Sequence, residues 1–146
     1  MKIMLKEAPE LQEPEVEFRY AKMDDTLKSL IQHIQNQEIY IWGEKAGREH
    51  RIQAISIQYI ETLKKQVFLY TESGVYHSSL RLYQVLDQVK DLDFVQISKT
   101  CVLNLNMLES IQTLKNSQLE VILENGKTLY VSRTYIQKIR EALKAK

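Results

Sequence analysis

From Arg51 to the C-terminus, apolar side chains recur in short segments that are separated by polar turns. Several of these segments alternate apolar and polar residues, which is the pattern of a strand with one buried face. None approaches the roughly 18 consecutive apolar residues that a membrane-spanning helix needs. The pattern therefore predicts a mainly β, antiparallel fold with a few short helices.

Apolar residues at helical spacing predict helices over 25–36, 79–90 and 134–144, with Asp24 or Asp25 capping the first. A polar hinge is expected over 61–66, and Asn125-Gly126 predicts a tight hairpin in which both residues have positive φ. The strands are expected at 15–20, 38–42, 52–60, 67–71, 75–77, 94–97, 101–105, 108–114, 119–123 and 128–131.

The chain of 146 residues is long enough for one domain with a short N-terminal annex. Both prolines, Pro9 and Pro14, fall in a glutamate-rich stretch, so residues 1–14 are expected to form a mobile leader. Residues 15–49 are expected to form a small β-α-β element that packs on the main domain, which spans 50–146.

The formal net charge of +1 divides unevenly, with −3 over residues 1–50 and +4 over residues 51–146. This charge permits a DNA partner without arguing for one. Cys101 is the only cysteine, which excludes an internal disulfide and suits a reducing compartment. The N-terminus has no apolar stretch typical of a signal peptide, and a cytoplasmic location is expected.

The chemistry of an enzyme is missing from the sequence. His33, His50 and His77 are isolated, and none has zinc-site spacing to another histidine or to Cys101. Each of the four glycines looks like a turn residue rather than part of a phosphate-binding loop. Cys101 begins an apolar strand and is expected in the core. We therefore expect no enzymatic activity, no cofactor and no metal.

Helical DNA-binding motifs are also missing, because a helix-turn-helix needs two adjacent helices and strand-rich segments separate those expected here. Three polar turns remain, each carrying a Lys or Arg that can donate to guanine or phosphate beside a hydroxyl or amide. Each also has a plain structural interpretation, as a solvated hairpin tip, a loop lysine or a helix cap. The candidate DNA-binding residues are Lys64, Lys65 and Gln66; Ser98, Lys99 and Thr100; and Ser132, Arg133 and Thr134.

Four segments of the sequence occur in the order of a known family pattern. They are Ile57-Gln58-Tyr59-Ile60-Glu61, the segment 80–86, Phe94-Val95-Gln96-Ile97-Ser98-Lys99-Thr100 with its continuation to Leu105, and the segment 123–135, which contains Val131-Ser132-Arg133-Thr134-Tyr135. Over residues 50–145 the chain resembles the LytTR DNA-binding domain.

The resemblance implies a β domain that lays loops into successive major grooves of a bent DNA site. Lys99, Arg133 and a residue near Lys65 or Gln66 would contact bases, whereas Asn104 would be structural. Where the family often has a histidine before the lysine, this chain has Ser98, so any contact there must come from a hydroxyl group.

The resemblance also implies a bacterial, standalone regulator, because the roughly fifty residues before the domain leave no room for a receiver domain. Asp24 and Asp25 are then no phosphorylation pocket. The implied partners are double-stranded promoter DNA with repeated sites, a second copy of the chain on that DNA, and a small membrane protein that restrains the regulator.

Two functions remain open from the sequence. The first is a sequence-specific DNA-binding transcription regulator. The alternative is a non-enzymatic protein-interaction module that docks a regulatory partner through the N-terminal element, with Tyr40 and Trp42 as possible anchors.

Overall fold

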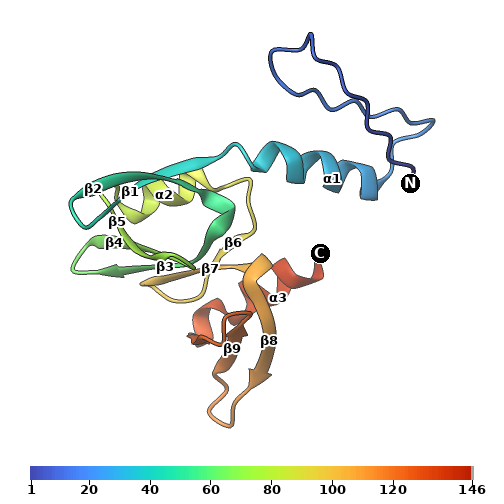
Figure 1. Ribbon diagram of the computed structural model, residues 1–146. Coiled ribbons are helices and arrows are strands. Elements are labelled where there is room, and N and C mark those ends of the chain that lie inside the picture. Colours follow the sequence, from blue (N-terminus) through green and yellow to red (C-terminus); the bar gives the residue numbers. More distant parts are fainter. Residues whose placement is uncertain (146) are drawn as a thin grey trace.

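A seven-stranded antiparallel sheet forms the centre of the molecule, and a three-stranded sheet packs below it in Figure 1. The structure is a computed structural model and describes residues 1–145. The large sheet has the order β2 (Arg48–Gln53), β1 (Tyr40–Lys45), β5 (Gly74–Ser78), β4 (Gln66–Thr71), β3 (Ile57–Leu63), β7 (Cys101–Asn104) and β6 (Phe94–Gln96). The small sheet has the order β10 (Thr128–Val131), β9 (Leu119–Leu123) and β8 (Leu108–Thr113).

Three α-helices complete the fold: α1 (Asp25–Asn36), α2 (Leu82–Gln88) and α3 (Arg133–Lys144). Single 3-10 turns over 54–56 and 105–107 lead into β3 and β8. The prediction of a mainly β, antiparallel fold with short helices is confirmed. Within residues 1–145 no helix is long and apolar enough to cross a membrane.

Both faces of the large sheet are covered because its central strands alternate apolar residues on each side. Tyr59 of β3 enters one hydrophobic cluster and Ile60, the next residue, enters the other. On one side α2 contributes Val85, and Val89, which directly follows the helix, packs in the same cluster. On the other side the small sheet and α3 pack, contributing Leu119, Val121, Leu123, Leu129, Val131 and Ile139. The core therefore has two parts, separated by the large sheet.

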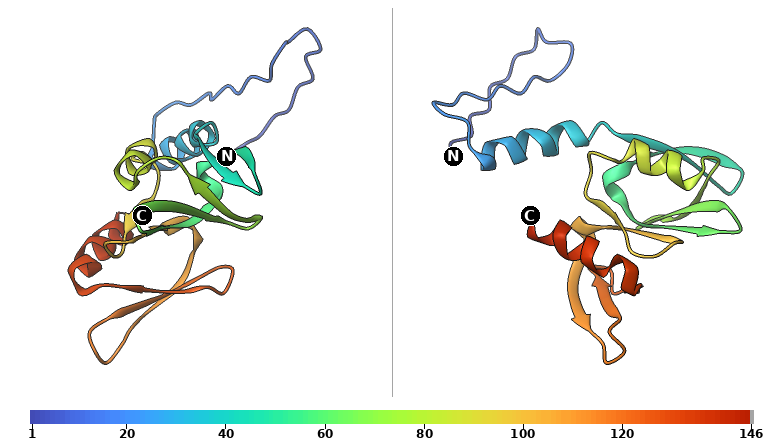
Figure 2. Two further views of the ribbon diagram at one scale, coloured as in Figure 1. Left: turned by 90° about the vertical axis from the view of Figure 1, so that its left-hand side faces the viewer. Right: turned by 180° about the vertical axis from the view of Figure 1, so that it is seen from behind.

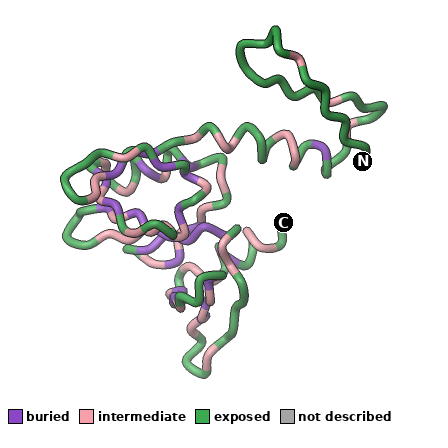
Figure 3. Tube along the Cα trace, in the orientation of Figure 1, coloured by how far each residue is buried: buried purple, intermediate pink, exposed green. Residues whose placement is uncertain are grey.

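Helix α1 and the residues before it extend away from the two sheets (Figures 1 and 2). The predicted cap is confirmed, since Asp24 Oδ1 accepts a hydrogen bond from the backbone N–H of Leu27 at 2.7 Å. Leu27 is the one buried residue of α1, and most of this part of the chain is exposed (Figure 3).

The strand predicted over 15–20 is wrong, because this segment has neither helix nor strand. An alternating segment forms a strand only where another strand supplies hydrogen-bonding partners, and within residues 1–145 none pairs with it. The second strand of the expected β-α-β element does form as β1, but it pairs with β2 and β5 in the large sheet. The boundaries at residues 14 and 49 stay predictions.

Two other segments differ from the sequence-based expectation. The strand expected over 52–60 is divided, because β2 ends at Gln53 and a 3-10 turn separates it from β3. The helix expected over 79–90 is shorter: the backbone N–H of Arg81 donates to Gln84 Oε1 at 2.9 Å where α2 begins. The Ser78 hydroxyl instead accepts from the N–H of Leu80 at 3.1 Å.

Candidate nucleic-acid interface

The β3–β4 connection is a two-residue hairpin turn made of Lys64 and Lys65. Leu63 and Gln66 form the last pair of the register, so the polar hinge predicted over 61–66 is wrong apart from Lys64 and Lys65. Lys64 has φ 52° and Lys65 has φ 67°, which is the conformation of a type I′ turn. A side chain in this region costs about 1 kcal/mol, and both lysines are exposed at the tip.

Arg81 lies beside this turn and is not among the residues predicted from the sequence. Its Nη1 donates to the carbonyl oxygen of Lys65 at 3.5 Å, from the start of α2. Arg81 falls inside one of the four family-like segments, but no local pattern indicates that the beginning of α2 packs against the β3–β4 turn. The contact adds a third exposed cation to Lys64 and Lys65.

The β6–β7 turn presents Lys99 between two hydroxyl side chains. Ser98 Oγ accepts from the backbone N–H of Thr100 at 3.2 Å and lies 3.4 Å from Thr100 Oγ1. The backbone N–H groups of Ile97 and Ser98 both donate to the carbonyl oxygen of Cys101, at 2.9 and 3.3 Å. The turn is therefore held by its own hydrogen bonds, and the exposed side chain of Lys99 is left free to point outward.

The third turn joins β10 to α3. Ser132 is the N-cap residue of α3, but its side chain makes no capping hydrogen bond, so the simple interpretation of Ser132 as a helix cap does not apply. Arg133 and Thr134 follow in the first turn of the helix and are exposed. Arg133 Nη2 donates to the backbone carbonyl oxygen of Asn116, at the β8–β9 turn, at 2.8 Å.

Backbone hydrogen bonds join the three turns into one surface. The N–H of Thr62 donates to the carbonyl oxygen of Thr100 at 2.8 Å, which links the β3–β4 hairpin to the β6–β7 turn. The N–H of Ser132 donates to the carbonyl oxygen of Ile97 at 2.9 Å, which links the β6–β7 turn to the start of α3. The structure thus brings together all three groups of predicted residues.

The charge of this surface is positive and uncompensated. It combines Lys64, Lys65, Lys99 and Arg133 with Arg81, and within residues 1–145 none of these side chains forms an ion pair with a carboxylate. Exposed cations without local partners are suited to phosphate and base-edge acceptors.

The large sheet beneath the turns is held by buried polar and aromatic groups. Asn104, 1% exposed, donates through Nδ2 to the carbonyl oxygens of Ile55 and Ile57, at 3.2 and 2.8 Å. Its Oδ1 accepts from the N–H of Asn106 at 3.1 Å, so its contacts are structural, as expected. Tyr59 stacks on Tyr70 with ring centroids 4.2 Å apart.

Cys101 lies in the core, as expected, and is 7% exposed. Burial, with a further contribution from Glu61, raises the pKa of its thiol to about 12. A thiol with this pKa is almost entirely protonated at neutral pH and is a poor nucleophile.

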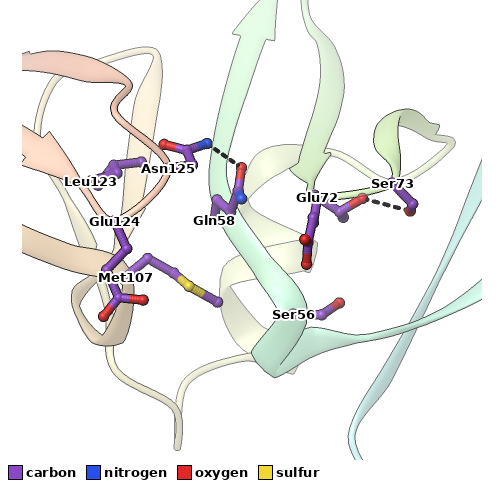
Figure 4. Close-up of a pocket in the computed structure, with 9 residues that line it drawn as sticks. Ser56, Gln58, Glu72, Ser73, Met107, Leu123, Glu124 and Asn125 are labelled. Carbon is purple, nitrogen blue, oxygen red and sulfur yellow. Dashed lines mark hydrogen bonds between the residues drawn. The ribbon is translucent and has the colours of Figure 1, made fainter.

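A pocket of about 600 Å³ opens at the other end of β3, near the β4–β5 turn and the β9–β10 hairpin (Figure 4). Asn125 Nδ2 reaches across to Gln58 Oε1 at 2.9 Å, and Glu72 and Glu124 give the rim a negative charge. None of the nine predicted DNA-binding residues lines it. The pocket is therefore separate from the basic turns.

The chain is similar to a sensory transduction protein and to proteins named as transcriptional regulators. It is 26% identical over 108 residues to the sensory transduction protein LytT of Enterococcus faecalis, covering 74% of this chain and 44% of the length of that relative. It is 24% identical over 130 residues to uncharacterized HTH-type transcriptional regulators of Staphylococcus aureus strains NCTC 8325 and COL, covering 88% of each chain. Despite that name, strands separate each helix from the next within residues 1–145.

Among solved structures, the LytTr DNA-binding domain of a methyl-accepting/DNA response regulator from Bacillus cereus has the same fold. The TM-score is 0.65 at 18% sequence identity, and the match covers 73% of this chain and 97% of that domain. The sequence model of the LytTr DNA-binding domain matches residues 47–144, which include the three turns, both sheets apart from β1, and α2 with α3. The chain belongs to the LytTR DNA-binding domain family.

Proposed function

We propose that this protein is a sequence-specific DNA-binding transcription regulator that contacts base edges in the major groove with its three linked turns. The observation that carries the proposal is the pair of backbone hydrogen bonds, Thr62 to Thr100 and Ser132 to Ile97, that place the turns on one surface. Separate exposed lysines are common on any protein, but a fixed group of them is suited to one DNA surface.

Each group has a role that its chemistry supports. Arg133 can donate two parallel hydrogen bonds to guanine O6 and N7, and Lys99 can donate to the same acceptors. Lys64, Lys65 and Gln66 contact a neighbouring groove segment or its phosphates, with Arg81 beside them. Ser98 and Thr100 hold the Lys99 turn in shape, while Ser132 and Thr134 offer hydroxyl groups to the backbone of the DNA.

The experiment is to select a preferred site from random duplex DNA and to measure binding of that site and a scrambled duplex by fluorescence anisotropy. Arg133→Ala is expected to weaken binding of the selected site by about 1–3 kcal/mol and to relax the preference at one base position. Lys64→Ala is expected to weaken the binding of both duplexes by similar factors. Equal binding of both duplexes by the unmodified protein would contradict the proposal.

We further propose that two copies bind a repeated site side by side, because one chain offers one set of turns and regulators of this kind gain affinity from paired half-sites. Sedimentation of the protein with duplexes that carry one or two selected half-sites tests this. We expect two copies to bind the double site. We also expect this binding to need a lower protein concentration than the binding of one copy to the single site. The restraining membrane protein stays a prediction from the family resemblance.

The alternative protein-docking function is favoured by one observation. Trp42 is 59% exposed, and it lines a shallow groove on the large sheet with Tyr40 and Leu80. Trp42→Ala is expected to leave DNA affinity unchanged, since Trp42 is not among the residues of the three turns. If the Trp42→Ala protein no longer discriminates the selected duplex from the scrambled duplex, Trp42 belongs to the DNA-binding function and gives no support to a separate docking function.

A further inference from the structure

The β8–β9 turn, residues 114–118, lies directly beside the start of α3. Arg133 Nη2 donates to the carbonyl oxygen of Asn116 at 2.8 Å, and Arg140 Nη2 donates to Thr113 Oγ1 at 3.2 Å. The two arginines are seven residues apart and therefore lie on one face of α3. The end of the small sheet is thus attached to the helix face that begins with Arg133.

The turn itself is fixed by internal hydrogen bonds. The N–H of Leu114 donates to the carbonyl oxygen of Gln118 at 2.8 Å, and the N–H of Ser117 donates to that of Leu114 at 3.1 Å. Asn116 Oδ1 accepts from the N–H of Gln118 at 3.1 Å. Lys115 is exposed on this ordered turn, so little backbone entropy is lost if the turn binds a partner.

The contact with Asn116 also limits where Arg133 can point. A guanidinium group has five N–H donors, and the carbonyl oxygen of Asn116 uses one edge of it, leaving other donors for a ligand. When Arg133 enters a groove, the turn must stand next to it, at the groove rim, where the phosphates lie. Lys115, which precedes Asn116 and is exposed, brings an ammonium group to that rim. Arg140 adds a second charge at the same end of β8 through its hydrogen bond to Thr113.

We propose that Lys115, supported by Arg140, binds the phosphate backbone of the DNA at the edge of the groove that Arg133 enters. This rests on the proposed function and extends the DNA-binding surface from the three predicted turns to a fourth. The phosphate is favoured over a base because an ammonium group is a single point charge without the paired donors that distinguish bases.

Lys115→Gln tests the proposal through the salt dependence of binding, measured between about 50 and 200 mM salt on the selected and the scrambled duplex. Loss of one phosphate contact is expected to reduce the slope of log affinity against log salt by about 0.9. Affinity is expected to fall by the same factor on both duplexes, with base preference unchanged. Lys115→Glu is expected to weaken binding further.

Lys90→Gln is the matched control, because Lys90 is also exposed. Lys90 follows α2 and is close in sequence to Asp93, which precedes β6 at the end of that strand remote from the Lys99 turn. Its slope is expected to equal that of the unmodified protein. An unchanged slope for Lys115→Gln, with discrimination still lost in Arg133→Ala, would overturn the phosphate contact and leave the proposed function standing. A changed base preference in Lys115→Gln would also overturn it. If the unmodified protein binds neither duplex, the proposed function fails first.

Discussion

The backbone N–H of Ser132 donates to the carbonyl oxygen of Ile97 at 2.9 Å. This bond connects the start of α3, which carries Arg133, to the turn that carries Lys99. The two cations are far apart in the sequence, and their relative position depends on this connection.

Removing the Ser132 N–H without changing the backbone tests that dependence. Ser132 has φ −64°, which proline adopts without strain, so Ser132→Pro deletes the bond and preserves the conformation. We expect a stability loss of about 1 kcal/mol and a loss of DNA discrimination, measured by urea unfolding and anisotropy.

Ser132→Ala is the control for that substitution. It keeps the N–H, and the hydroxyl it removes makes no capping hydrogen bond, so stability is expected to change by less than about 0.5 kcal/mol. A loss near 1 kcal/mol, typical of a removed cap, would contradict this description of the helix start.

The strained β3–β4 turn predicts opposite effects on stability and on DNA binding. Lys65 has φ 67°, a region that glycine occupies without steric cost. Lys65→Gly is therefore expected to raise the free energy of unfolding by up to about 1 kcal/mol and to weaken DNA binding. Lys99→Gly is the comparison, because Lys99 is not among the positive-φ residues. It is expected to lower stability, by about 0.5–1 kcal/mol, and equal stability changes in the two variants would contradict the assigned strain.

The buried hydrogen bonds of Asn104 predict that its replacement causes a large loss of stability without a change in base preference. Asn104→Ala leaves the carbonyl oxygen of Ile57 and the N–H of Asn106 without the partners that Asn104 supplies. We expect a loss of roughly 2–4 kcal/mol in urea unfolding. Asn125→Ala, at an exposed hairpin, is expected to cost less than about 1 kcal/mol. If folded Asn104→Ala selects a different DNA site, Asn104 is more than structural.

The raised pKa of the Cys101 thiol predicts that the protein loses stability at alkaline pH. Its pKa rises from 9.0 to about 12 in the folded protein, so the folded state retains the proton more strongly than the unfolded state. The contribution of the thiol to the free energy of unfolding is therefore fully present below pH 9. It falls by about 1.4 kcal/mol per pH unit as the pH rises from 9 toward 12.

Urea unfolding between about pH 7 and 10.5 measures this effect. Cys101→Ala lowers stability at every pH through lost packing. Above pH 9, however, the stability of this variant should fall less steeply than that of the unmodified protein. Tyr59, whose pKa is raised to about 12 first by burial and least by Cys101, keeps most of its contribution when Cys101 is replaced. Parallel curves for the two proteins would show that the thiol does not contribute.

Much of the secondary structure follows from local patterns. The apolar residues of the segment 52–60 predict a strand, and its second half begins β3, where Tyr59 and Ile60 point to opposite sides of the sheet. Asp24 predicts the start of α1 because a carboxylate there accepts from the first free N–H groups of the helix. The strand predicted over 15–20 fails for the complementary reason that a local pattern does not supply a partner strand.

The two hairpins show the limit of local signals. Asn125-Gly126 is the strongest hairpin signal of the chain, yet only Gly126 has positive φ there, at 87°. The N–H of Leu123 donates to the carbonyl oxygen of Lys127 at 2.9 Å, so the residues 124–126 form the loop, one residue more than in a type I′ turn. Lys64 and Lys65, which no propensity places in a type I′ turn, adopt that conformation. The register of the long β3 and β4 strands leaves only these two residues between the last pair, and the pairing of the strands outweighs the cost of the turn.

By itself, the sequence determined most of the strands and helices and the three polar turns that form the DNA-binding candidate. Only the tertiary structure decided that these turns meet, that Arg81 joins them, and that Asn116 holds Arg133 beside Lys115. The reason is that a strand or a turn is encoded within a few residues, whereas Ser132 and Ile97, or Arg133 and Asn116, become neighbours only when distant strands and a helix pack around a common core.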